Sequence, residues 1–153
     1  MKTIILSLMT IGAVLGAAGC ASQITRESAP VPMSAPVRLS DSSRLQGSWT
    51  GREPAATPEG ASHFIIAGNT FEFRGTDPNE WYKGTFTIME DTNPKQITIL
   101  VKEGPAPEYI GKNSNGIYRF DGGKLIISAN EPGNPDRPSA FEAPGSRTIE
   151  FAK

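Results

Sequence analysis

The sequence has 153 residues and a formal net charge of −1, with 15 Lys and Arg against 16 Asp and Glu. This length suits one folded domain, and the absence of a basic patch or basic–aromatic pattern argues against nucleic acid as a partner. The 16 Gly and 13 Pro fall between short apolar runs, as turn residues do, and after the N-terminal segment no long run has helical periodicity. Composition and patterning therefore favour an all-β domain.

The N-terminal residues 1–19 have the layout of a secretory signal peptide. Lys2 supplies a positive charge, residues 3–18 are mostly apolar or small, and Cys20, the only cysteine, follows. As a helix the apolar segment would span roughly 24 Å, which is short of the ~30 Å hydrocarbon core of a bilayer. The sequence therefore predicts an export signal and not a transmembrane helix.

Cys20 stands directly after three small residues, Ala17-Ala18-Gly19. This pattern resembles the lipobox of bacterial lipoproteins, in which the cysteine is diacylated, with palmitate for example, and becomes the new N-terminus. A thiolate is the nucleophile that this S-alkylation requires. The lipobox usually has Leu where this chain has Ala17, so the alternative is cleavage by an ordinary signal peptidase that leaves a secreted protein. The resemblance implies a lipid-anchored protein of the outer membrane that faces the periplasm, because Ala21 and not Asp follows the cysteine.

Residues 20–43 are predicted to be the lipidated cysteine followed by a tether. The segment is rich in Ser, Ala and Pro and has no apolar period. As a flexible coil it would span about 25–30 Å. The folded domain, expected at 44–153, would then stand off the membrane without a fixed orientation.

Eight strand candidates follow, and their apolar–polar alternation is clearest at 85–88 and 148–151. Eight antiparallel strands are enough to close a barrel whose interior side chains can just fill. The connecting loops alternate between long and short, which predicts an up-and-down barrel with a long-looped mouth at one end and a tight base at the other. The candidates cover residues 47–52, 62–67, 70–74, 81–88, 96–101, 115–120, 124–129 and 147–152.

The first strand opens with Gly47-Ser48-Trp49, and the alternation of loops brings Trp49 beside Lys153 at the base and places Arg147 near the mouth. The G-x-W resembles the opening of lipocalin barrels, where the Trp closes the base under a cation, here Lys153. Three stretches are together similar to an uncharacterised planctomycete-type domain family described as lipocalin-like. They are LQGSW from Leu45, GIYRFDGGKL from Gly116 and RPSAFEA from Arg137. The resemblance covers 44–153 and implies the barrel fold, but that family has no established activity.

No constellation of catalytic or metal-binding residues is apparent. His63 is the only histidine, and neither a zinc site nor a Ser-His-acid triad can be built around it. Glu90-Asp91 lie in a turn, and the Asp-containing stretches at 77–79 and 130–136 lack the spacing of a calcium loop. No glycine-rich stretch has the context of a phosphate loop. The sequence therefore predicts a protein without metal or cofactor that is not an enzyme.

Four apolar residues of outward parity form a candidate partner surface. An exposed apolar stripe of this kind can bind another protein, but the loop 130–146 or the tether can equally cover it. The four are Trp81 at the mouth end and Leu100, Ile117 and Ile126 on three consecutive strands.

The inward-facing residues are mostly large aromatic and aliphatic side chains, with Gly84, Gly116 and Ala129 as the few small ones. We therefore expect a solid lower half and a small cavity under the mouth. Two functions stay open: a binder of a small apolar ligand in the cell envelope, or an envelope protein that binds another protein through mouth loops or the outer stripe, as an inhibitor or scaffold. The candidate ligand-binding residues are Tyr82, Phe86, Val101, Tyr118, Ala129 and Arg147.

Acylation of Cys20 would anchor the protein, since two or more acyl chains give stable membrane binding where one alone is marginal. We expect Cys20→Ser to move the domain from the membrane fraction to the soluble fraction, as measured by fractionation of cells that express each form. A folded Cys20→Ser protein that stays with the membrane would show that the tether is not the anchor.

Overall fold

The computed structural model describes residues 39–53 and 60–153. The predicted signal peptide, Cys20 and the tether before residue 39 lie outside the described residues. The eight strands lie where the sequence predicts them, with bounds that differ by two residues at most. Neither helix of the described residues is long and apolar enough to cross a membrane. The elements are α1 (Asp41–Leu45), β1 (Gly47–Arg52), β2 (Ser62–Ala67), β3 (Thr70–Arg74), β4 (Trp81–Met89), β5 (Lys95–Glu103), the 3₁₀ helix η1 (Pro107–Tyr109), β6 (Asn113–Asp121), β7 (Lys124–Asn130) and β8 (Ser146–Ala152).

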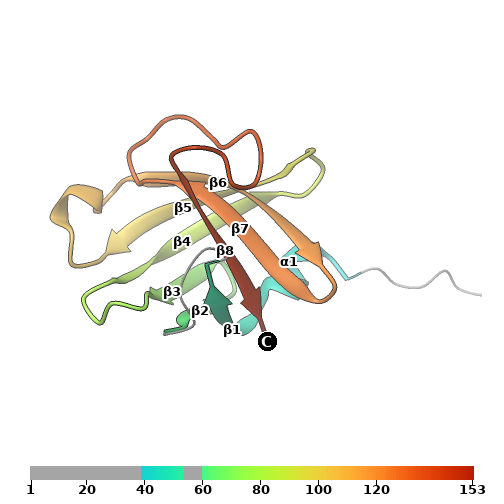
Figure 1. The fold of residues 1–153 in the computed structure, drawn as a ribbon, viewed down its shortest axis with the longest axis horizontal. Coiled ribbons are helices and arrows are strands. Elements are labelled where there is room, and N and C mark those ends of the chain that lie inside the picture. Colours follow the sequence, from blue (N-terminus) through green and yellow to red (C-terminus); the bar gives the residue numbers. More distant parts are fainter. Residues whose placement is uncertain (1–38, 54–59) are drawn as a thin grey trace, which may run out of the picture. The chain divides into compact units, whose positions relative to one another are not determined.

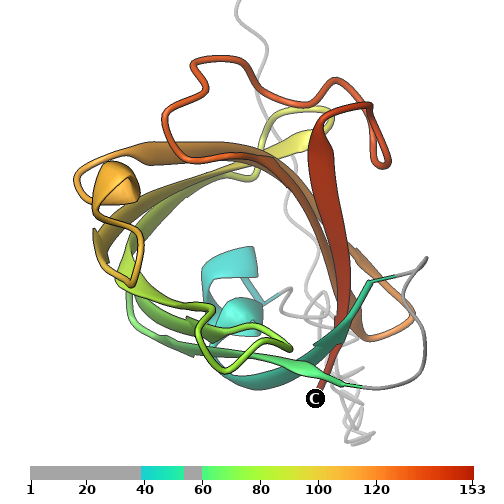
Figure 2. The same ribbon diagram turned by 60° about the vertical axis from the view of Figure 1, so that its left-hand side comes forward.

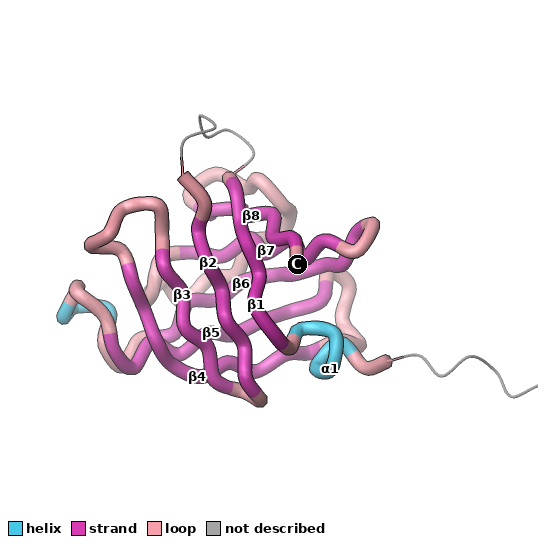
Figure 3. The backbone as a smooth tube through the Cα atoms, turned by 90° about the horizontal axis from the view of Figure 1, so that it is seen from below, coloured by secondary structure: helices cyan, strands magenta, loops and turns pink. Residues whose placement is uncertain are grey.

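The strands form one closed antiparallel barrel in which each strand pairs with its neighbours in the sequence and β1 pairs with β8 (Figure 1). This confirms the predicted all-β, eight-stranded up-and-down fold. Figure 3 shows α1 and η1 at opposite ends of the barrel. The short turns and α1 make the base, and the long loops with η1 make the mouth.

The seam between β1 and β8 is short, because only residues 50–52 of β1 pair with residues 150–152 of β8. Gly51 lies at its centre, opposite Phe151. A Cβ atom at Gly51 would lie 2.4 Å from the Phe151 ring and 2.6 Å from Ser62 Oγ. The barrel therefore closes here only because residue 51 has no side chain.

All eight strands contribute buried apolar side chains to one core inside the barrel. Phe64 is the aromatic centre of this core: its ring centroid lies 5.7 Å from that of Phe71, 6.3 Å from that of Phe73 and 5.4 Å from that of Phe151. The aromatic side chains of the inward-facing set belong to this core or pack against it: Trp49, Phe64, Phe71, Phe73, Phe86, Tyr118, Phe120 and Phe151. The buried members include Leu45, Trp49, Phe64, Ile66, Phe71, Phe86, Ile97, Tyr118, Leu125, Ile127, Ile149 and Phe151.

Helix α1 lies across the base of the barrel (Figure 2). Its first three residues belong to the segment that the sequence analysis assigns to the tether, so the folded part begins earlier than predicted. Five residues are too few for a stable isolated helix. Here Ser40 caps the helix by accepting a hydrogen bond from Ser43 N at 3.3 Å, and the fully buried Leu45 inserts into the core. Tertiary contacts therefore hold the helix in place.

The buried carboxylate of Asp41 joins α1 to the strands at the base. It accepts a hydrogen bond from Tyr118 Oη at 3.0 Å, forms an ion pair with Lys95, and lies 3.3 Å from Arg44 Nη1. Burial alone would raise the pKa of Asp41, but the hydrogen bonds and charges of these partners outweigh it and hold the pKa below its ordinary value. The same contact and burial raise the pKa of Tyr118, so its hydroxyl stays a donor.

Trp49 completes the base in the predicted arrangement. Its side chain is buried, and its Nε1 donates a hydrogen bond to the Leu45 carbonyl at 2.7 Å. Lys153 Nζ lies 4.6 Å from the centre of the Trp49 ring and donates to the Arg44 carbonyl at 3.2 Å. Gly47 starts β1 beside this cluster, with Lys153 Cε 4.0 Å from the position of a Cβ atom.

The loop between β7 and β8 covers part of the outer surface of the barrel (Figure 2). Arg137 fastens it by donating to the carbonyls of Ile97, at 2.6 Å, and Gly116, and to Thr98 Oγ1 at 2.9 Å. The same loop buries Pro138. The guanidinium of Arg137 is therefore hydrogen-bonded to β5 and β6.

The predicted partner surface is therefore wrong in part, because two of its four residues are buried. Ile117 is fully buried and Ile126 is 4% exposed, although both point out of the barrel core. Leu100 is half-buried, and only Trp81, at 36%, is exposed. The outward parity is therefore right, but the apolar stripe is not a free surface.

Replacing Trp49 tests the base. We expect Trp49→Ala to lower the free energy of unfolding by about 3–5 kcal/mol, the range for truncating a core aromatic. Urea denaturation of both proteins measures this difference. The matched control is Trp81→Ala, which removes the same side chain from an exposed site and should cost far less. Equal costs for the two variants would contradict the burial of Trp49.

The lowered pKa of Asp41 predicts that the folded protein loses stability in acid. Because its pKa is lowered in the folded state, its contribution is complete above its unfolded pKa near ~4 and is lost as the pH falls through the lower, folded value. We expect Asp41→Asn to be less stable than the unmodified protein by about 1–3 kcal/mol at pH 7, with the gap shrinking below about pH 4. Asp91→Asn, at an exposed site in the same end of the barrel, is the control. A gap that does not change with pH would be evidence against this role of Asp41.

Candidate functional site

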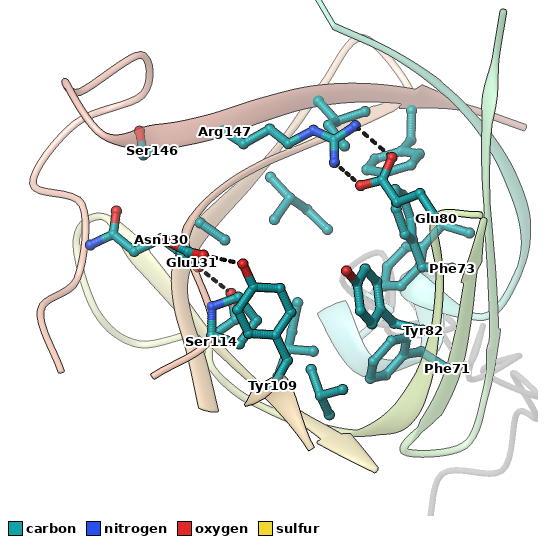
Figure 4. A pocket seen from close by; sticks show the side chains of 18 of the residues that line it. Phe71, Phe73, Glu80, Tyr82, Tyr109, Ser114, Asn130, Glu131, Ser146 and Arg147 are labelled. Carbon is teal, nitrogen blue, oxygen red and sulfur yellow. Dashed lines mark hydrogen bonds and ion pairs between the residues drawn. The ribbon is translucent and has the colours of Figure 1, made fainter. Parts of the chain in front are cut away.

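A cavity of about 470 Å³ opens at the mouth of the barrel (Figure 4). Small-molecule sites in proteins typically measure about 300–1,000 Å³, so the cavity is larger than the small space predicted from the sequence. Its floor and walls are apolar, with Phe64, Phe71, Phe73, Ile99, Val101, Ile127, Ala129, Ile149 and Phe151 among them. Its rim is polar and includes Glu80, Tyr82, Tyr109, Ser114, Glu131 and Arg147.

The small inward residues lie where neighbouring strands approach one another closely. Gly116 on β6 pairs directly with Ala129 on β7, and Gly84 on β4 pairs with Val101 on β5. The register between β4 and β5 also shifts at Gly84, which is a bulge of the kind found at barrel rims. Of these small residues only Ala129 lines the cavity. A Cβ atom at Gly116 would lie 2.7 Å from the Ser128 carbonyl oxygen, and one at Gly84 would overlap the Leu100 carbonyl oxygen, so the two glycines permit close backbone approach.

Arg147, on β8, forms an ion-pair cluster at the rim. Its Nη2 lies 2.6 Å from Glu53 Oε1, its Nε donates to the same oxygen at 2.7 Å, and it also pairs with Glu80. The guanidinium carbon stands 5.8 Å from the centre of the Phe73 ring. Burial lowers the pKa of Arg147, but the hydrogen bonds to Glu80 and Glu53 outweigh it and raise the pKa. Arg147 is therefore a charged but fully engaged part of the wall.

Tyr82 and Tyr109 stand at the rim with their ring centroids 6.1 Å apart (Figure 4). Tyr109, carried by η1, donates its hydroxyl hydrogen to Glu131, and this bond raises the pKa of Tyr109 to about 12. Tyr82 points its hydroxyl into the cavity, where among the described residues it has no hydrogen-bond partner. Burial first, and then the charge of Glu80, raise the pKa of Tyr82. It thus offers a neutral hydroxyl to a ligand.

Gly104 sets the position of Tyr82. A Cβ atom at this residue would lie 2.5 Å from the Tyr82 ring, so the loop after β5 can pass the ring only with glycine there. The backbone at Gly104 therefore packs directly against the ring of Tyr82, one of the polar residues of the rim.

The structure brings together four of the six predicted ligand-binding residues, since Tyr82, Val101, Ala129 and Arg147 line the cavity. Phe86 and Tyr118 do not line it, and their assignment was wrong. Phe86 is buried in the core. Tyr118 lies near the base, where it pairs with Lys95 at the start of β5 and binds Asp41.

Sequence reasoning missed the residues that the loops contribute. Tyr109, Glu80 and Glu131 lie in or beside loops, where no apolar alternation marks a side chain as facing the interior. The only available signal was the length of the mouth loops, because long loops on a rigid scaffold commonly carry binding residues.

Other groups that the sequence analysis weighed have structural roles. Asp77 Oδ1 accepts from Asn79 N at 2.7 Å, and Asn134 Oδ1 accepts from Asp136 N at 2.9 Å, which is turn chemistry. His63 is exposed on β2. Among residues 39–53 and 60–153, no three His, Cys, Asp or Glu side chains gather as metal ligands would.

Comparison with models of protein families, with curated proteins and with solved structures gives no match to this chain. The resemblance to the planctomycete-type family stays a prediction. The function is therefore argued from the geometry of the mouth.

Proposed function

We propose that the protein is a cell-envelope binding protein that holds a small apolar ligand in the mouth cavity of its barrel. The observation that carries this proposal is the cavity of about 470 Å³ with aromatic and aliphatic walls and a polar rim. This combination is typical of small-molecule sites, in which apolar walls supply affinity and a few polar groups orient the ligand.

The placement of the chain supports the envelope part of the proposal. The described chain begins at residue 39, beside α1 at the base, and the mouth lies at the other end of the barrel (Figure 3). A tether that joins the domain at the base would not obstruct the mouth, whatever orientation the domain takes. The anchor itself rests on the signal and Cys20 in the sequence.

The alternative is a module that binds another envelope protein through the mouth loops or the outer stripe. The stripe supports it less than the sequence suggested, because Ile117 and Ile126 are buried. Among the described residues, the large apolar side chains that remain exposed on strands are Ile65 on β2 and Trp81 and Met89 at the two ends of β4. Strand β3 separates β2 from β4. The cavity is the stronger feature.

Filling the cavity tests the proposal. We expect an environment-sensitive apolar dye to bind the unmodified domain, and Ala129→Leu to weaken this binding about tenfold, because the larger side chain occupies the space. The matched control is Ala67→Leu at an exposed position at the end of β2, which should bind the dye unchanged. Dye fluorescence and a thermal melt of each variant give the readout. A folded, unmodified domain that binds no dye would overturn the proposal.

A further inference from the structure

The loops at the mouth of the barrel carry more acidic than basic side chains. The described residues of its four loops hold seven acidic and two basic side chains. Two of these acidic residues, Glu80 and Glu131, line the cavity, and neither of the two basic residues does. The acidic residues are Glu53, Asp77, Glu80, Glu108, Glu131, Asp136 and Glu142.

The residues that line the cavity also include more acidic than basic side chains. Arg147 is its only cationic residue within the described part of the chain, and it is shared between Glu80 and Glu53. Glu131 adds a further carboxylate, of which Oε1 accepts from Tyr109. The negative charge reaches the interior, since after burial the charges of Glu80 and Glu108 are the main causes that raise the pKa of Tyr82. The cavity therefore lies in a field of net negative charge.

Aromatic rings face the same space. Phe73, Tyr82 and Tyr109 line the upper cavity, where the carboxylates also lie (Figure 4). The negative faces of aromatic rings attract ammonium groups, and rings combined with carboxylates are the usual surroundings of a bound organic cation. A fatty-acid carboxylate would meet repulsion from these groups and would find the one arginine already paired.

We propose that the ligand of the mouth cavity is an organic cation, an apolar body that carries one amine or quaternary ammonium group near Glu131 and Glu80. This inference rests on the proposed function, because it assigns the chemical class of the ligand for the same cavity. The apolar body contacts the aromatic floor, and the cationic group stays at the rim, where it is partly hydrated and costs little to desolvate.

Three probes with the same alkyl chain test the charge preference: dodecyltrimethylammonium, dodecanol and dodecanoate, each below its micelle concentration. Displacement of the apolar dye from the unmodified domain measures their affinities. We expect the cation to bind about tenfold more tightly than the alcohol and the alcohol more tightly than the carboxylate. Added salt should reduce the preference for the cation, since it screens the rim charges.

Glu131→Gln removes one rim charge and keeps an oxygen for Tyr109. It should weaken binding of the cation severalfold and leave the alcohol unchanged. The control is Glu103→Gln, at an exposed site at the end of β5 and outside the cavity lining, which should change neither. Equal binding of all three probes, or tightest binding of dodecanoate, would overturn the charge inference and leave the proposed function standing. Failure of every probe and of the dye to bind would instead overturn the proposed function.

Discussion

The fold depends on how the base of the barrel is closed, and the buried carboxylate of Asp41 is central to that closure. A carboxylate out of water destabilises a protein unless charges and hydrogen bonds compensate it. Here Lys95 on β5 and Tyr118 on β6 do so, and they thereby bind a helix too short to persist alone to two strands. Leu45 and Trp49 then seal the same end. Because one end is sealed with apolar side chains, the interior opens only at the mouth.

Because the base is closed, the barrel has two different ends, the sealed base and the open mouth. At the α1 end, Leu45 and Trp49 belong to the buried core and close the barrel. The cavity beside Ala129 opens at the mouth, whose loops contribute polar groups such as Glu80 and Glu131 to its rim. Loops held by a scaffold of regular secondary structure commonly carry the binding residues of a protein.

The alternation of apolar residues predicted the strands and their inward faces, because side chains in a strand alternate with a period of two. It could not predict height along the barrel axis, since strands tilt and their register staggers. Tyr118 was therefore rightly placed inside and wrongly placed at the mouth. Helix α1 gave no period at all in five residues. The burial of Ile117 and Ile126 depends on a loop fastened by Arg137, and no local pattern predicts such a long-range contact.

Arg137 and Arg147, two of the arginines in the mouth half of the barrel, are both bound to groups of this chain. An arginine at a cavity rim, as the sequence suggests for Arg147, usually indicates an anionic ligand, because the guanidinium pairs well with carboxylate and phosphate. In this protein Arg147 meets two carboxylates of its own chain, and Arg137 is turned to the outer face of the sheet. Both arginines are used to hold loops to the barrel. Glu53 and Glu80 share the single charge of Arg147, and Glu131 has no cationic partner among the described residues. The wall of the mouth therefore keeps a net negative charge.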